Sequence, residues 1–567
     1  LGDVYKRQAQ MSGLNHEMRV EALRDRIFAA LARGDENAAR KGIKQLHRVV
    51  PAEAAGLLTA LHIEAGRTRE ALAAWRECAR LVPRDPYTIF LRARIHLLAG
   101  ERTAALNLLT PLLDAQMPPA IAEKVYNIAG QCARFLGRAA EAVRFYERAR
   151  DAAPDRVLRA LNASNVLFNR HYLSTSLAED KSAAEEYGAL FADVHTFDHT
   201  AHEMGERRLR IGYISPDVRE HVVLSFSYAL MTALDPARFE VTVYALNAED
   251  AYTERVKHAI EHFRNLMCCS AEEAAHAIFR DGIDILVDLA GHTAGRTLPI
   301  LAYRPAPVQI SGIGWFATTG VPFVDGFLTD EVLSPAGSEA FYSEELLRLP
   351  HAFHFTPDRA MRARAVAERP ADAPVTFGVF QNFMKINEEC LKVWGRILKK
   401  LPQAQLILQD AAVDSPLRVT TILEMIEGLK LPAKRIFVRT GKRDYLGDYG
   451  DIDIALDTFP YTGGASTATA LYMGVPVVSL RGETHHASRL GTAMLTAAGK
   501  AAWIAEDART YENLAVRMAE DIAVVRASRT ALRAEVEQSA LMDVDAYLAA
   551  FTAEIERLWA ERGDFSR

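Results

Sequence analysis

One loop in the sequence has residue types and spacing suited to binding phosphate. An apolar run ends at Asp457, two adjacent glycines follow at Gly463 and Gly464, and a helix is expected to begin near Ala465–Ser466. The first amides of a helix have no intrahelical acceptor and lie at the positive end of its dipole, so they favour anions. Glycines at this point would let a phosphate approach the backbone closely. The alternative interpretation is an ordinary strand–helix turn with a Ser or Thr cap.

Two lysines follow strands that are predicted in the same part of the chain. Lys385 comes shortly after the apolar run 375–380, and Lys442 follows a run that ends at Thr440. Parallel strands present their carboxyl ends at one edge of a sheet, so both ammonium groups would meet the glycine loop there. Taken alone, a surface lysine is the better interpretation of either residue. The convergence of three strand ends is what indicates a diphosphate site.

Short apolar runs that alternate with helical segments must position these groups. From Arg207 onward this pattern predicts two consecutive doubly wound α/β domains, joined by the proline-rich linker 357–374 and facing each other across a cleft. The run 546–559 is amphipathic and predicts a closing helix. Strands are expected at 209–215, 239–246, 283–289, 308–313 and 327–329 in the first domain, and at 375–380, 405–409, 436–439, 452–457 and 477–480 in the second.

The N-terminal third repeats itself. Four glycines lie 32, 34 and 37 residues apart; each is followed five residues later by alanine, and three of them 17 residues later by proline. These glycines are Gly34, Gly66, Gly100 and Gly137. The pattern predicts a tetratricopeptide superhelix over 11–155 and a helical linker over 156–206. The alternative is a generic Ala-rich helical bundle. The groove of such a superhelix usually binds extended peptide.

Three pairs of residues could serve as metal ligands, but each has a structural interpretation. Asp451-Ile-Asp453 runs into a predicted buried strand, and Asp543-Val-Asp545 precedes a predicted helix as a cap. The His485-His486 pair is typical of a polar loop. We therefore expect no metal. Five scattered cysteines without CxxC spacing predict neither a disulfide framework nor a zinc site, and they fit a reducing compartment.

The composition excludes several classes of protein. With 567 residues, 49% hydrophobic and 25% charged, the chain has ordinary globular composition and room for about four domains. A net charge of −6 does not indicate a general nucleic-acid binder. We expect a cytoplasmic protein without a membrane span, because no run of 18 apolar residues occurs. Residues 1–10 differ from the Ala/Arg/Leu-rich chain that follows, so we expect Met11 to be the natural start.

Taken together, these features resemble the O-linked N-acetylglucosamine transferases, glycosyltransferase family 41. The resemblance spans nearly the whole chain and implies a tetratricopeptide superhelix followed by a two-lobe α/β (GT-B type) enzyme. It further implies inverting, metal-independent transfer of N-acetylglucosamine from UDP-GlcNAc to Ser or Thr of proteins, with the repeats guiding the protein or peptide acceptor. The matching stretches are Gly212–Asp217 with His221, Leu301–Gln309, Phe380–Lys385, Leu456–Thr458 with Gly463, and Gly482–Thr484 with Ala487–Arg489.

The resemblance also implies roles for individual residues. Lys385 would neutralise the diphosphate leaving group, and Asn382 would contact the nucleotide. His221 matches the histidine proposed as proton acceptor; the alternative is a loop histidine that shapes the acceptor site. Further donor contacts are implied for Thr440, Gly441 and Lys442 at uracil and ribose, Tyr445 near the base, Gly464, Ala465 and Ser466 at the phosphates beside Gly463, and Thr469 near the ribose.

Several positions depart from the pattern of the animal members. Thr469 replaces an aspartate for the ribose hydroxyls, Tyr445 replaces a histidine, and Ala465 replaces a threonine. A different UDP-sugar, a non-protein acceptor, or a repeat scaffold with an inactive transferase domain therefore stay open as alternatives. The expected lobes are 207–372 on the acceptor side and 373–535 for the UDP-sugar, and the expected closing segment is 536–567.

Overall fold

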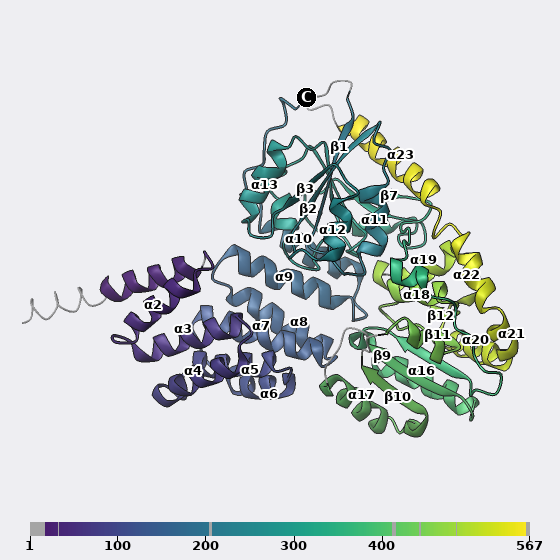
Figure 1. Ribbon diagram of the computed structural model, residues 1–567, viewed down its shortest axis with the longest axis horizontal. Helices are drawn as coiled ribbons and strands as arrows, with labels where there is room; N and C mark the ends of the chain where they lie inside the picture. The colour runs from purple at the N-terminus through teal and green to yellow at the C-terminus, as the bar shows by residue number, and fades with distance from the viewer. Residues whose placement is uncertain are drawn as a thin grey trace, which may run out of the picture. The chain divides into compact units, whose positions relative to one another are not determined.

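The computed structural model describes residues 18–31, 33–202, 207–410, 416–440, 444–482 and 485–562 (Figure 1). The described residues form two compact units. The first reaches to Leu136 and includes Asp151–Pro154, and the second contains Gly137–Arg150 and everything from Asp155 onward. None of the described helices is both long enough and apolar enough to cross a membrane.

The first unit consists of paired helices joined by glycine turns. The glycines at 34, 66 and 100 all adopt φ between 70° and 79°, a left-handed conformation that favours glycine. The alanine five residues after each of them is completely buried, so the paired helices approach closely. Pro51 is the first residue of the next helix, where its missing N–H costs nothing. The helices are α2 (Glu36–Leu46), α3 (Pro51–Glu64), α4 (Thr68–Leu81), α5 (Pro86–Leu98), α6 (Arg102–Leu109) and α7 (Pro119–Phe135).

The second unit begins with three further helices and continues into an α/β lobe. These helices are α8 (Ala139–Ala152), α9 (Arg156–Arg170) and α10 (Leu177–Ala189), and the last two lie in the region 156–206, for which the sequence predicts a helical linker. Helix α10 packs directly on the lobe, because a Cβ at Gly188 would lie 1.9 Å from the carbonyl oxygen of Gly320. The α/β lobe that follows has a seven-stranded parallel sheet of order β3-β2-β1-β4-β5-β6-β7.

The strands of this N-terminal lobe include the five that were predicted. The central strands are buried along nearly their whole length, as continuous apolar runs in a parallel sheet require. Sequence reasoning missed β3 and β7, which are the edge strands: β3 is mostly exposed and β7 is polar at both ends. The strands are β1 (Leu209–Ser215), β2 (Phe239–Ala245), β3 (His262–Asn265), β4 (Ile285–Asp288), β5 (Val308–Ser311), β6 (Gly326–Thr329) and β7 (Glu345–Arg348). The helices are α11 (Leu224–Thr232), α12 (Ala251–Lys257), α13 (Ala271–Arg280) and α14 (Leu298–Leu301).

The C-terminal lobe repeats this architecture with a six-stranded parallel sheet of order β10-β9-β8-β11-β12-β13. Among the strands described in this lobe, only the two-residue strand β13 was not predicted. The strands are β8 (Thr376–Phe380), β9 (Gln405–Asp410), β10 (Ile436–Thr440), β11 (Ile454–Leu456), β12 (Val477–Leu480) and β13 (Ile504–Ala505). The helices are α16 (Glu388–Lys400), α17 (Pro416–Gly428), α18 (Ala465–Tyr472), α19 (Leu490–Ala497), α20 (Ala508–Glu520), α21 (Ile522–Ala527) and α22 (Arg529–Glu537).

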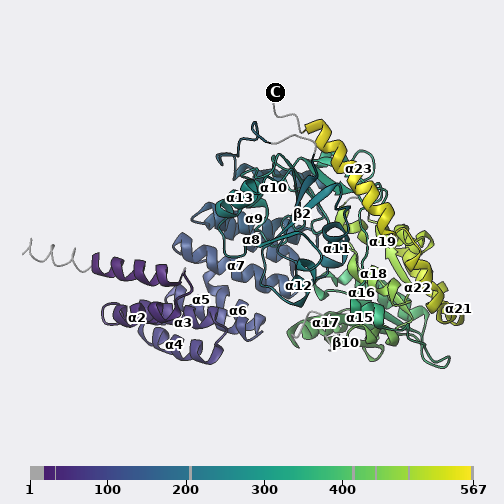
Figure 2. The ribbon, with the colours of Figure 1, turned by 45° about the horizontal axis from the view of Figure 1, so that its top comes forward.

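The chain then crosses back to the N-terminal lobe in helix α23 (Val544–Arg562), which lies along that lobe in both views (Figures 1 and 2). Arg557 bonds Glu345 of β7 at 2.6 Å, and the Tyr547 hydroxyl donates to the carbonyl of Ala352 at 3.2 Å. The predicted closing helix is therefore present, and its side chains bond the N-terminal lobe.

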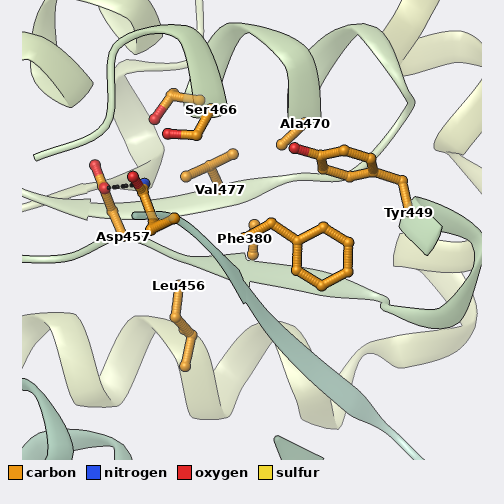
Figure 3. A pocket seen from close by; sticks show the side chains of 10 residues that line it. Phe380, Tyr449, Leu456, Asp457, Ser466, Ala470 and Val477 are labelled. Carbon is orange, nitrogen blue, oxygen red and sulfur yellow. Dashed lines mark hydrogen bonds between the residues drawn. The ribbon is translucent and has the colours of Figure 1, made fainter. Parts of the chain in front are cut away.

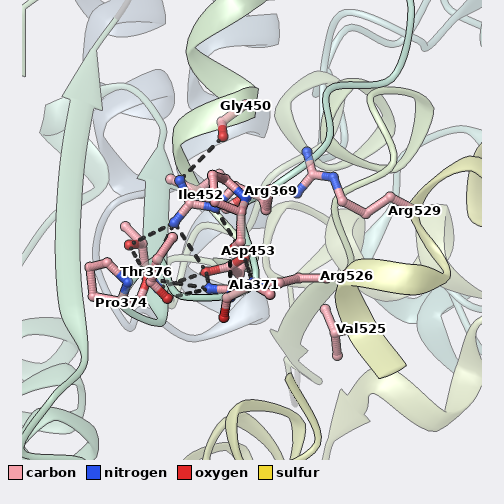
Figure 4. Close-up of polar contacts among 12 residues, drawn as sticks. Arg369, Ala371, Pro374, Thr376, Gly450, Ile452, Asp453, Val525, Arg526 and Arg529 are labelled. Carbon is pink, nitrogen blue, oxygen red and sulfur yellow. Dashed lines mark hydrogen bonds and ion pairs between the residues drawn. The ribbon is translucent and has the colours of Figure 1, made fainter. Parts of the chain in front are cut away.

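The linker between the lobes is held on the C-terminal lobe by one buried carboxylate. The linker contains the short helix α15 (Arg359–Ala363). Asp453, just before β11, pairs with Arg369 of the linker at 3.1 Å and with Arg526 of α21 at 2.8 Å (Figure 4). Its burial alone would raise the pKa of this carboxyl, but the two guanidinium groups hold that pKa below its usual value. Asp453 therefore has a structural role.

Candidate active site

The strand order of the C-terminal sheet creates a crevice between β8 and β11. The connection from β8 runs to β9 on one side of the sheet, and the connection from β11 runs to β12 on the other. Ligands of open parallel sheets bind at the carboxyl ends of strands where the order reverses in this way. The loop after β8 carries Lys385, and the loop after β11 carries Gly463 and leads into α18. Lys385 and the glycine loop therefore lie at the same edge of the sheet.

Lys385 ends a short 3₁₀ turn, Phe383–Lys385, and reaches across the crevice. Its Nζ donates to the carbonyl oxygen of Thr462 at 2.7 Å and lies 3.8 Å from the centre of the Tyr461 ring. Burial lowers the pKa of Lys385 to about 8, against the opposing charge of Asp457. An ammonium has three donors, and one of them bonds Thr462, so two can serve an anion.

Asp457 organises the loop in front of α18. Its carboxylate accepts a hydrogen bond from the Gln381 side chain at 2.9 Å, dashed in Figure 3. It also accepts from the Gly463 amide and from the Ser479 hydroxyl, both at 2.7 Å. Burial raises the pKa of this carboxyl, and the Ser479 hydrogen bond, the charge of Lys385 and the Gly463 hydrogen bond oppose the shift. One buried carboxylate therefore ties together the ends of β8, β11 and β12.

The two glycines of the loop differ in how much space a side chain would have at their positions. A Cβ at Gly463 would lie 2.4 Å from the Gln381 amide nitrogen and 2.5 Å from the Ser466 hydroxyl, so no side chain fits there. A Cβ at Gly464 would meet only Leu490, at 3.9 Å. Gly463 is thus required by packing, and its amide points to Asp457 instead of toward a ligand. Gly464 precedes α18 without any side-chain cap, which leaves the helix start to other acceptors.

An aromatic group borders the same crevice. The Tyr445 hydroxyl lies 2.9 Å from the Tyr449 hydroxyl, and the Tyr445 ring centre lies 6.1 Å from that of Phe380 on β8. Burial raises the pKa of Tyr445 to about 12, so it stays a neutral phenol. A small pocket opens beside this group and reaches the start of α18. It is lined by Phe380, Gln381, Tyr449, Ala455, Leu456, Asp457, Ser466, Thr467, Ala470 and Val477.

The other predicted donor residues have the following positions. Asn382 is exposed, and its side chain accepts from the Met384 amide at 3.1 Å. Thr440 ends the edge strand β10, and Thr469 lies buried within α18, which begins at Ala465. Gly441 and Lys442 lie outside the described residues. The assignment of all these residues to the donor stays a prediction.

His221 lies on the N-terminal lobe, in the loop that follows the central strand β1. Its Nδ1 is 3.5 Å from the Asp217 carboxylate and 3.4 Å from the Val223 amide, so its polar contacts lie within its own loop. The Val223 amide can donate to Nδ1 only when that nitrogen carries no proton, whereas the tautomer that serves as a base carries its proton on Nδ1, toward Asp217, and leaves Nε2 to accept one. Burial lowers the pKa of His221, Asp217 opposes this shift, and the imidazole is neutral at pH 7. A neutral imidazole is the form that a general base requires.

The remaining candidate ligands have structural partners. His485 contacts Asp180 of α10 at 2.9 Å, and the wholly buried His486 packs against Phe316 and Phe327. Asp543 accepts from the Ala546 amide at 3.0 Å and so caps α23, as its position before that helix predicts.

Sequence reasoning missed two residues at the centre of this arrangement, Gln381 and Asp457. The available signal was their position, because each comes at the carboxyl end of a buried strand at the point where the strand order reverses. The sequence could not show that the two side chains bond each other.

Two parallel α/β lobes, with an anion-suited helix start and a lysine at the crevice of the second, define a GT-B glycosyltransferase fold. The sequence model of Glycosyl transferase family 41 matches residues 185–369 and 357–551. The chain belongs to this family.

Individual relatives agree with this assignment. A probable UDP-N-acetylglucosamine–peptide N-acetylglucosaminyltransferase SPINDLY from Arabidopsis thaliana is 33% identical over 412 residues, which is 70% of this chain and 44% of that protein. The protein of the same name from Petunia hybrida is 35% identical over 362 residues, 62% of this chain and 38% of that protein. This chain thus matches less than half the length of these curated relatives. A solved structure of a Thermobaculum terrenum O-GlcNAc transferase mutant has a TM-score of 0.73 at 26% identity, covering 97% of this chain and 99% of that one.

Proposed function

We propose that the protein transfers N-acetylglucosamine from UDP-GlcNAc to Ser or Thr hydroxyls of proteins, with inversion and without a metal ion. The names of the relatives above support the sugar and the acceptor class. The observation that carries the proposal is the position of Lys385, whose ammonium bonds Thr462 just before the uncapped start of α18. A diphosphate at this helix start would meet both the helix amides and a fixed cation.

The chemistry follows from this arrangement. When the glycosidic bond breaks, negative charge grows on the leaving UDP, and a positioned ammonium stabilises that charge more in the transition state than in the ground state. Lys385 and the first amides of α18 would stabilise this charge in place of a metal ion. The acceptor hydroxyl would attack from the opposite face of the sugar, which inverts the anomeric centre.

His221 would receive the proton of the acceptor hydroxyl at Nε2. Its position after β1, at the carboxyl edge of the central strands of the N-terminal sheet, supports a role on the acceptor side. The contact with Asp217 would stabilise the imidazolium that forms. We further propose that the helical repeats guide the protein acceptor.

Release of UDP from a panel of UDP-sugars, with and without protein acceptors and with and without EDTA, tests this function. We expect release from UDP-GlcNAc, stimulation by protein acceptors and no loss on chelation. Activity that EDTA removes and Mg²⁺ or Mn²⁺ restores would contradict metal independence. A clear preference for another UDP-sugar would show that UDP-GlcNAc is not the donor. No release under any condition would favour an inactive scaffold.

A further inference from the structure

The helical segment ahead of the lobes places one unusual histidine against both of them. His171 directly follows α9 and is only 6% exposed. Within the described part of the chain, neither of its ring nitrogens has a hydrogen-bond partner. Buried polar side chains almost always have at least one partner, so both nitrogens of this imidazole can bond a bound ligand or an ordered water.

The surroundings of His171 connect it to the proposed leaving-group site. Its ring centre lies 4.6 Å from that of Trp315 and 6.4 Å from that of Phe316, both of the N-terminal lobe. Its ring centre also lies 5.9 Å from that of Tyr461, in the loop before α18. The Lys385 ammonium lies 3.8 Å from the centre of the same Tyr461 ring. His171 and Lys385 therefore share Tyr461 as a neighbour.

The charge state of His171 selects the kind of group it can bind. Burial lowers its pKa to about 4; Asp180 opposes the shift, and His485, Arg170 and Lys385 reinforce it. The ring is thus neutral at pH 7, with one N–H donor and one lone-pair acceptor. The acceptor nitrogen is unfavourable beside a phosphate, whereas hydroxyl and amide groups can donate to that nitrogen or accept from the N–H of the other.

We propose that His171 hydrogen-bonds the sugar of the UDP-sugar donor and helps determine which sugar is accepted. This inference rests on the proposed function, in which Lys385 takes the diphosphate. The sugar is attached to that diphosphate, so it must lie next to Lys385. Aromatic walls with a few fixed polar groups are the usual lining of a small-molecule site, and Trp315, Phe316 and Tyr461 supply such walls.

A second buried histidine provides a matched control. His292 packs against the same Trp315, with ring centres 4.8 Å apart, and burial lowers the pKa of His292 to about 3. Its ring nitrogens are both bonded, Nδ1 to the Ser164 hydroxyl at 2.9 Å and Nε2 to the Thr319 carbonyl at 2.8 Å. The two residues share burial and an aromatic neighbour, and they differ in whether their nitrogens are already used.

The test compares the affinities of UDP and UDP-GlcNAc by calorimetry in the full chain and in His171→Phe, His171→Gln and His292→Phe. Phenylalanine keeps the packing on Trp315 and removes both polar atoms, while glutamine keeps a donor and an acceptor and serves if the phenylalanine variant fails to fold. We expect His171→Phe to bind UDP within about twofold of wild type and UDP-GlcNAc about tenfold more weakly or worse. His171→Gln should recover part of this loss, and His292→Phe should lower the melting temperature without changing the ratio of the two affinities.

Equal changes in both affinities for His171→Phe, or no change in either, would overturn the inference and leave His171 a packing residue. A ratio that shifts as much in His292→Phe would overturn it as well, since any damage around Trp315 would then suffice. Failure of the wild-type protein to bind UDP-GlcNAc while it binds UDP would instead contradict the proposed donor. The two failures are therefore distinguishable.

Discussion

The side-chain amide of Gln381 donates a 2.9 Å hydrogen bond to Asp457, and this bond joins the ends of β8 and β11 at the crevice of the C-terminal lobe. Through Asp457 it also fixes the Gly463 amide, which lies three residues before Ser466 in α18. The geometry of the loop before α18 thus depends on a carboxylate that makes no proposed contact with substrate.

Replacing Asp457 by leucine should therefore destabilise the fold. The change leaves the buried donors of Gln381, Gly463 and Ser479 unpaired, at about 1–3 kcal/mol for each unsatisfied group. Asp457→Asn should cost less, because its oxygen can still accept from Gln381 and Gly463 and the Ser479 hydroxyl can accept from its amide. Urea unfolding measures the order of the two variants; equal stability of Asp457→Leu and wild type would contradict the role of Asp457.

Gly463→Ala and Gly464→Ala form a matched pair. The first places a methyl group 2.4 Å from Gln381 and 2.5 Å from Ser466, whereas the second meets only Leu490 at 3.9 Å. We expect Gly463→Ala to lower the melting temperature and weaken UDP binding, and Gly464→Ala to preserve the fold. Thermal unfolding and UDP titration check both. If Gly463→Ala bound UDP and melted like wild type, the close packing of this loop would be wrong.

Lys385→Ala should abolish most transfer while the fold persists. Loss of one group that stabilises developing charge typically lowers the rate by roughly 10²–10³. Lys392 of α16, exposed and paired with Glu388 at 3.0 Å, is the control lysine, and Lys392→Ala should leave the rate unchanged. Initial rates of UDP release measure the effect. More than about a tenth of the wild-type rate in Lys385→Ala would remove its leaving-group role.

The pKa of Lys385 also predicts a dependence on pH. A lysine whose pKa burial lowers to about 8 is protonated below that pH and loses its charge as the pH rises through it. Because the charged form stabilises the leaving group, kcat/KM should fall above about pH 8. The profile of kcat/KM between pH 6 and 10 tests this. A profile that stays flat to pH 10 would show that the charge of Lys385 is not needed or not titrated in this range.

His221→Ala should separate peptide transfer from hydrolysis of the donor. If His221 acts on the acceptor, its loss should slow transfer to peptide, where general-base help is worth about 10²–10⁴, more than the slow hydrolysis of the UDP-sugar. His262, exposed on β3, provides a control substitution. Both rates are measured from UDP release with and without peptide. Equal losses in the two reactions would contradict the acceptor-side role.

The sequence by itself determined the elements and the residue types at their ends. Continuous apolar runs predicted the buried strands. The edge strands β3 and β7 were not predicted, because a strand at the edge of a sheet does not require such a run. The placement of Lys385 and Gly463 at one edge of the sheet could be predicted because both residues follow strands, and the carboxyl ends of parallel strands share one edge.

Only the tertiary structure decided which side chains meet across that edge. The bond between Gln381 and Asp457 joins residues 76 positions apart, and the reach of Lys385 to Thr462 spans 77. The position of His171 between Trp315 and Tyr461 depends on three separate segments of the chain. Periodicity reports how each segment faces its own sheet or helix neighbour, whereas such contacts follow from how the sheets, loops and helices pack in three dimensions.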